Sequence, residues 1–236
     1  MVDAELTSAA AEADGWSLLF DVPTLTAWSK PGKGKDTILR CAVTIDLPPD
    51  QATDMMINLS PACLAWKDTF KYVEVERDYG PHDQVIAAHT RLPRCATAAR
   101  PGPDAHPSRR AQVARAGLKV PWLIKYMMSM PDEMCVRCVI RPDFPTAGSI
   151  SYVIVPFDLA NNVALTELGM LKIKSGVISP LAGEPGKCVL YSLDMVNLSM
   201  MPSWGMSMML KSVVMKQMTK MVSLFKASDY CQQKYG

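Results

Sequence analysis

Short runs in which hydrophobic and polar residues alternate recur along the chain. They include WSLLFDV, TILRCAVTIDL, YVEVERDYG, QVIAAHTRL, MCVRCVIRPDF, GSISYVIVPFD and KCVLYSLDMVNL. Successive side chains of a β-strand point to opposite faces, so this pattern predicts strands with one buried face. The turn sequences KPGKGKD and YGPHD separate neighbouring runs and indicate hairpins. The sequence therefore predicts an antiparallel sheet.

Apolar residues at helical intervals replace the alternation in three places. Residues 3–13 are rich in alanine, and residues 48–70 have a proline and acidic start that predicts one or two short helices. Residues 202–227 form the longest helical pattern. Its apolar face carries Met206, Leu210, Val213, Val214, Met218, Met221, Leu224 and Phe225. This order of elements predicts an α+β fold with a sheet wrapped about a long terminal helix, in a single domain over residues 1–236.

Residues 93–117 follow neither pattern. Prolines, glycines and alanines dominate this segment, which predicts a long loop with at most a helical turn near residues 109–115. Arginines are frequent around it, and the one acid among them is Asp104. The loop is either a solvated excursion or a surface for anionic lipid, in which case Arg109 and Arg110 are the expected membrane contacts.

Composition and charge restrict the class of protein. A formal net charge of +2 gives no electrostatic reason to expect nucleic acid as a partner. The first residues are acidic rather than basic and no apolar run follows them, so we expect no secretory signal. No uninterrupted apolar run approaches the ~20 residues that a membrane span requires. We therefore expect a cytoplasmic protein that reaches organelle membranes only as a peripheral protein.

Cysteine and histidine positions indicate no catalytic or metal chemistry. The chain has seven cysteines, an odd number, which favours reduced thiols over a disulfide framework. Cys135 and Cys138 have CxxC spacing, but strand residues three apart face opposite sides, and no second ligand pair is near. His82, His89 and His106 show no triad pattern. We expect no metal, no cofactor and no enzyme activity, although an acid–base pair assembled in space stays an open alternative.

The methionine-rich face of residues 202–227 has two interpretations. Methionine is unbranched and polarizable, so a wall of methionines adapts to an irregular apolar ligand. The same stripe also suits an ordinary protein core. Periodicity alone favours the core.

The stretch SPLAGEPGKCVLYSLDMVNLSMMPSW resembles the end of the steroidogenic acute regulatory protein-related lipid transfer (START) domain, nearest to its cholesterol-carrying branch. The matching positions are Pro180, Leu181, Ala182, Gly183, Pro185, Lys187, Ser192, Asp194 and Pro202. MCVRCVIRPDFPTAG is similar to the V-R-C strand of the family, and Trp66 matches a tryptophan that precedes another strand. Ser179 stands where the cholesterol branch has a histidine, which leaves the ligand open.

The resemblance implies a helix-grip fold in which residues 202–227 form a lid helix over one lipid in an internal tunnel. It places Arg137 inward, beside a ligand hydroxyl. The ligand-contacting residues expected on this basis are Arg137, Tyr152, Tyr191, Met195, Met206, Leu210, Val214, Met218 and Met221. The implied function is transfer of a sterol or related isoprenoid between membranes by a monomer that touches membranes transiently. A carrier of phospholipid or another two-chain lipid, and a helix-grip cyclase or hydrolase, are the alternatives.

Overall fold

The computed structural model describes residues 14–34, 36–56, 70–78, 110–118, 132–167 and 171–197, together with residues 215, 216, 218–220, 222 and 223. These residues contain ten strands and helix α2 (Pro49–Met56). Within β4 (Phe70–Asp78) and β5 (Arg110–Leu118), only some side chains are described.

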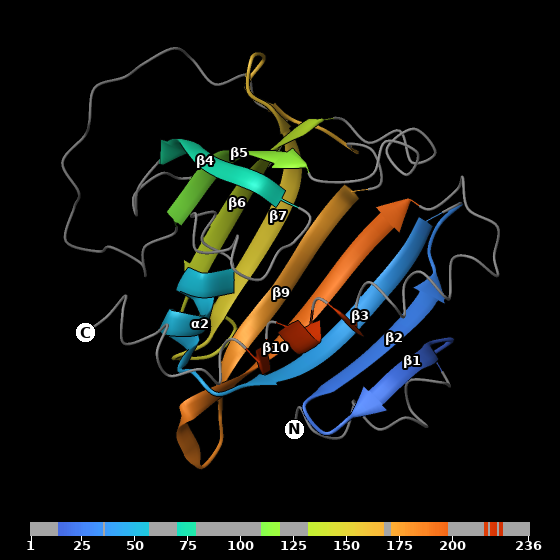
Figure 1. Ribbon diagram of the computed structural model, residues 1–236, viewed down its shortest axis with the longest axis vertical. Helices are drawn as coiled ribbons and strands as arrows, with labels where there is room; N and C mark the ends of the chain where they lie inside the picture. The colour runs from blue at the N-terminus through green and yellow to red at the C-terminus, as the bar shows by residue number, and fades with distance from the viewer. Residues whose placement is uncertain are drawn as a thin grey trace.

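One antiparallel sheet forms the framework of the fold (Figure 1). Its strands follow the order β1-β2-β3-β10-β9-β7-β6-β5-β4, and β8 pairs with β7 beside this path. The remaining strands are β1 (Ser17–Val22), β2 (Leu25–Pro31), β3 (Asp36–Ile45), β6 (Glu133–Pro142), β7 (Ile150–Asp158), β8 (Val163–Ala164), β9 (Leu171–Leu181) and β10 (Glu184–Asn197). Strand β10, the last strand among the described residues, thus lies in the middle of the sheet, between β3 and β9.

The alternation in the strands gives the sheet an inner face that is mostly apolar. The register aligns Cys41 with Ser192, Ser192 with Gly176, and Gly176 with Tyr152. We call this side the inner face because its residues form the main core with α2 and with Met218. Its buried members include Cys41, Val43, Ile45, Val136, Cys138, Ile140, Tyr152, Ile154, Ile178, Cys188 and Leu190.

Helical residues cover the inner face. Ala52, Met55 and Met56 of α2 are buried in the same core as Met218 and Val222. Figure 1 shows α2 and the red C-terminal residues in front of the same side of the sheet. Apolar side chains from both ends of the sequence therefore pack on one face, which confirms the predicted sheet-and-helix arrangement.

The described part of the C-terminal segment agrees with the predicted amphipathic helix. Met218 and Val222 are buried, whereas Lys216, Thr219 and Ser223 are exposed. Residues spaced four apart lie on one side of a helix, so Met218 and Val222 share the side that meets the sheet. Most of the predicted helix over 202–227 lies outside the described residues.

One boundary of the predicted loop over 93–117 is wrong. Residues 110–118 form β5, which pairs with β4 on one side and β6 on the other. Alanine, glycine and arginine favour strands weakly, but Ala111, Val113 and Ala114 are buried. Pairing and burial between two neighbouring strands outweigh the local preference. The predicted strand QVIAAHTRL lies outside the described residues.

Candidate functional site

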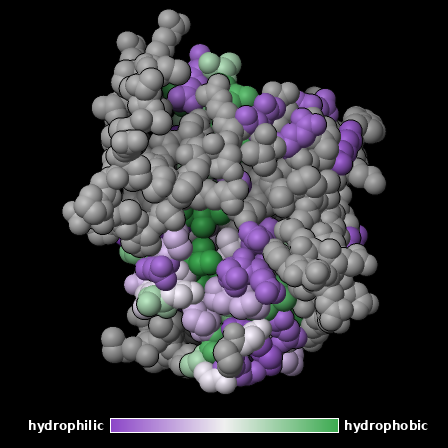
Figure 2. All heavy atoms as spheres, turned by 90° about the vertical axis from the view of Figure 1, so that its left-hand side faces the viewer, coloured by the Kyte–Doolittle hydropathy of each residue, from purple (hydrophilic) through white to green (hydrophobic). Residues whose placement is uncertain are grey.

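Two rows of cross-strand neighbours define the centre of the inner face. The first row is Cys41, Ser192, Gly176, Tyr152 and Ile140, and the second is Leu39, Asp194, Lys174, Ile154 and Cys138. The second row carries a positive and a negative charge between apolar side chains. Figure 2 shows apolar atoms near the middle of one face of the molecule, between polar and grey surfaces.

Lys174 and Asp194 form an ion pair across β9 and β10. The Lys174 Nζ donates to Asp194 Oδ2 at 2.8 Å. Their side chains keep 27% and 22% of their surface exposed, whereas neighbouring Tyr152 and Cys41 are 2% and 5% exposed. A partly exposed charged pair within a mostly apolar face is suited to contact the polar end of a ligand.

Burial and the ion pair fix the protonation of this cluster. Burial is the largest influence on the pKa of Lys174 and lowers it, but the charge and hydrogen bond of Asp194, together with Tyr152 and Cys41, raise that pKa by more, so the net shift is upward. Burial raises the pKa of the Tyr152 phenol, and it raises the pKa of the Cys41 thiol to about 12. At neutral pH Lys174 is therefore charged, and Tyr152 and Cys41 keep their protons.

The absence of a side chain at Gly176 leaves room for the ring of Tyr152 on the inner face. A Cβ atom at Gly176 would lie 2.7 Å from the Tyr152 hydroxyl and 2.8 Å from its Cε1, and would also overlap the carbonyl oxygen of Tyr191. The Tyr152 ring therefore lies over the glycine of the neighbouring strand. Lys174 and Asp194 contribute to the electrostatic environment of the Tyr152 hydroxyl.

Two of the residues predicted to contact a ligand lie with the inner-face core. Tyr152 is buried at its centre, and Met218 packs there from the C-terminal helix. Met206, Leu210, Val214, Met221 and Arg109 lie outside the described residues, so their roles stay predictions. Arg110 begins β5, and its side chain is not among those described.

Three predicted ligand contacts lie on the opposite, outer face of the sheet. Arg137 stands between Val136 and Cys138, which are both in the inner-face core. Because neighbouring residues of a strand point to opposite faces, the Arg137 side chain points outward. Its Cζ lies 5.7 Å from the centroid of the Phe157 ring. The inward orientation implied by the family resemblance is therefore wrong for Arg137.

Tyr191 and Met195 occupy the outer face for the same reason. Both alternate with Ser192 and Asp194 on β10, whose side chains point inward. Their cross-strand partners on β3 are Ala42 and Ile38, which pack against the outer-face tryptophans. These two residues therefore lie on the side of the sheet away from Lys174.

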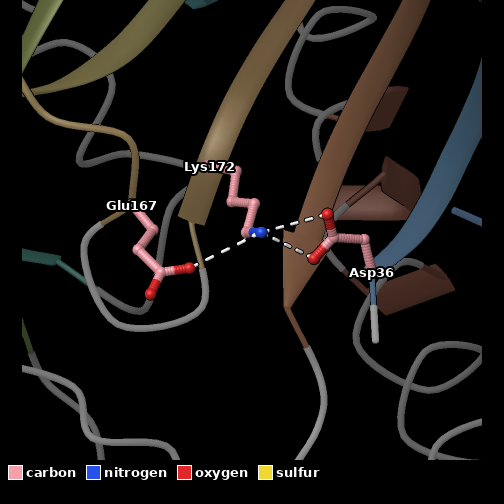
Figure 3. A network of polar contacts seen from close by, with 3 residues as sticks. All are labelled: Asp36, Glu167 and Lys172. Atoms are coloured by element: carbon pink, nitrogen blue, oxygen red, sulfur yellow. Dashed lines mark hydrogen bonds and ion pairs between the residues drawn. The ribbon is translucent and has the colours of Figure 1, made fainter. Parts of the chain in front are cut away.

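A second polar cluster holds the ends of three strands together (Figure 3). Lys172 Nζ lies 2.8 Å from Asp36 Oδ1 and 3.0 Å from Asp36 Oδ2, and 3.6 Å from Glu167 Oε2. Asp36 begins β3 and pairs with Asn197, the last residue of β10. The cluster thus bridges β9 and β3 where the chain leaves β10 towards the C-terminal helix.

The described residues contain no cluster of three or more side chains suited to hold a metal ion. Cys135 and Cys138 lie on opposite faces of β6, because they are three positions apart in the strand, and only Cys138 belongs to the inner-face core. The four described cysteines, Cys41, Cys135, Cys138 and Cys188, form no disulfide. Within the same part of the chain, no helix is both long and apolar enough to cross a bilayer.

Sequence reasoning missed Lys174 and included Asp194 only as part of a family motif. The signal was a pair of lysines, Lys172 and Lys174, on one side of the run KIKSGVI if that run is a strand. A charge at an inward position of a strand indicates a buried partner. That reasoning requires the strand's inward side to be known.

Comparison with known proteins identifies the fold. No family model and no curated protein matches the sequence. Human STARD10 superposes with a TM-score of 0.58 at 14% identity, over 99% of this chain and 83% of that one. The lipid transfer and protein localization domain of human StarD13 superposes with a TM-score of 0.58 at 13% identity, over 95% of this chain and 96% of that one. A STAR-related lipid transfer protein from Xanthomonas axonopodis superposes with a TM-score of 0.54 at 13% identity, over 90% of this chain and 99% of that one. The chain therefore has the START-type helix-grip fold.

Proposed function

We propose that the protein binds one apolar lipid between the inner face and the C-terminal helix and carries it between membranes. The observation that carries the proposal is the apolar inner face, with a partly exposed ion pair at its centre and Met218 packed over it. Burial of apolar ligand surface would supply the affinity, at ~25 cal/mol per Å² before the cost of ordering. The lipid-transfer names of similarly folded proteins support the same function.

We propose a sterol or related isoprenoid as the cargo, with a two-chain lipid as the alternative. A carrier needs no proton transfer, and the protonation of the cluster suits that role. Lys174 stays protonated because Asp194 raises its pKa, and burial keeps Tyr152 and Cys41 protonated as well. None of these three groups can act as a general base at neutral pH, and the Asp194 carboxylate is held in its ion pair with Lys174.

Loading and release require membrane contact and movement of the lid. We propose that residues 202–227 open as this lid. We also propose that Arg109 and Arg110 contact anionic lipid. In this proposal the protein works as a cytoplasmic monomer. Met218 lies on the side of the helix that faces the sheet. Lid opening would therefore expose Met218 to membrane lipid.

The test combines native mass spectrometry of the purified protein, extraction of its lipid, and transfer between donor and acceptor liposomes. Met218→Asp should abolish lipid uptake because it buries an unpaired carboxylate at the apolar face. Thr219→Asp is the matched control, since Thr219 is exposed on the same helix. Circular dichroism and the melting temperature separate loss of binding from loss of folding. A folded wild-type protein that neither carries nor transfers lipid contradicts the proposed function.

A further inference from the structure

We propose that Lys174, Asp194 and Tyr152 form the subsite for the polar end of the lipid, and that this subsite selects an uncharged, hydroxyl-bearing head over an anionic one. The inference rests on the proposed function. It assigns head-group recognition to β9, β10 and β7, rather than to Arg137 on β6.

The charge balance of the subsite disfavours an anionic head. Lys174 is matched by Asp194, with 2.8 Å between Nζ and Oδ2. Lys172, the other lysine of β9, is matched by Asp36 at 2.8 Å. Among the described residues, β9 therefore offers no surplus positive charge. A phosphate or carboxylate beside Lys174 would also lie beside the Asp194 carboxylate, and their repulsion is strong where water is scarce.

The hydrogen-bonding capacity of the pair suits a hydroxyl group. An ammonium group has three donors, and Lys174 uses one of them on Asp194. The second carboxylate oxygen, Asp194 Oδ1, is buried and accepts no hydrogen bond from the described residues. A ligand hydroxyl can accept from Lys174 and donate to Asp194 after rotation of the carboxylate. An ester or ether oxygen can only accept, so it leaves the carboxylate unsatisfied.

Tyr152 limits the size of the head that fits. Its ring is held over Gly176, its neighbour in the first row of the inner face, with its hydroxyl next to the glycine backbone. The residue is 2% exposed, so it has little freedom to move aside. A compact hydroxyl fits beside Tyr152 more readily than a bulky head group.

The experiment measures selectivity with probes that share an apolar body. Cholesterol, its 3-deoxy analogue and cholesteryl sulfate compete against a fluorescent sterol, and dioleoylglycerol against dioleoylphosphatidic acid repeats the comparison on two chains. The wild-type protein should prefer each hydroxyl form by about tenfold or more, because an unpaired buried polar group is costly.

Two variants remove the selectivity in different ways. Lys174→Met with Asp194→Leu removes both charges, so the preference for the hydroxyl should fall to about twofold while binding of the 3-deoxy sterol persists. Asp194→Asn leaves Lys174 unmatched, so the preference should shift towards cholesteryl sulfate and phosphatidic acid by about tenfold. The second variant decides the matter if the first does not fold.

The outcomes distinguish the two proposals. An unchanged hydroxyl preference in the folded double variant, or an unchanged ratio of neutral to anionic lipid in Asp194→Asn, overturns the subsite. A wild-type protein that binds apolar lipids without discriminating their heads also overturns it, yet leaves the lipid carrier intact. Failure of the wild-type protein to bind any of the five probes contradicts the proposed function itself.

Discussion

Gly176→Ala should destabilise the protein without touching any charge. The new Cβ would lie 2.7 Å and 2.8 Å from two atoms of Tyr152 and would also overlap the backbone oxygen of Tyr191. The Tyr152 ring can move only by disturbing its neighbours, since it is 2% exposed, and the Tyr191 carbonyl is part of β10. Overpacking of this kind costs about 2–3 kcal/mol. For a chain of this length the melting temperature should fall by about 5–10 °C.

The assay is thermal and urea unfolding, followed by circular dichroism, with Gly186→Ala as the control. Gly186 also lies in β10, but a Cβ there would meet no atom within 4 Å. The control should change the free energy of unfolding by less than about 0.5 kcal/mol. Tyr152→Ala is itself destabilising, but it removes the ring that the new Cβ would meet, so the loss in the double variant should be about 1 kcal/mol smaller than the sum of the two single losses. If Gly176→Ala is as stable as Gly186→Ala, the close approach of β7, β9 and β10 is wrong.

Three further predictions concern pH, ion pairs and membranes. Burial raises the pKa of the Cys41 thiol from 9.0 to about 12, so the folded protein holds the thiol proton more tightly than the unfolded chain does. The stability that the protonated thiol contributes is therefore intact below pH 9 and is lost as the pH rises from 9 towards 12. Urea unfolding of the wild type should lose about 1.4 kcal/mol more than Cys41→Ser between pH 8 and pH 10; equal losses contradict the shift. Lys172→Met should lower the urea midpoint clearly, because its partner Asp36 is 10% exposed. Lys187→Met removes one member of an exposed pair and should leave the midpoint nearly unchanged. Equal effects of the two variants would refute the role of Lys172 in joining the ends of β3 and β9. Arg109→Ala with Arg110→Ala should weaken sedimentation with anionic liposomes at low salt, and a defect that persists at high salt argues against an electrostatic contact.

The strands were predictable where alternation and burial agree. MCVRCVIRPDF and GSISYVIVPFD place apolar residues at every second position, and both are neighbouring strands in the sheet. Residues 110–118 show the limit of such reasoning. Their alanines and glycine carry no alternation that is detectable in the sequence, and only pairing with β4 and β6 defines them as a strand.

The inward or outward position of a residue was harder to predict than the strand itself. MCVRCVIRPDF is apolar on both sides of Arg137, so the pattern does not say which set faces the core. The resemblance assigned Arg137 inward. The structure buries Val136 and Cys138 in the core instead, and a shift of one position reverses every side chain of a strand.

The residues of the polar pair lie on different strands, so the pair could not be predicted from any single stretch of sequence. Lys174 and Asp194 are 20 residues apart in sequence and become neighbours through the register of β9 and β10. Tyr152 joins them because Gly176 leaves space for its ring. Asp194 also lies near the end of β10 at Asn197, where Lys172 and Asp36 hold the strand ends together. The group proposed to bind the lipid head is therefore on the strand that precedes the proposed lid in the sequence. A change in the head contact would act close to the start of the segment that we propose to open.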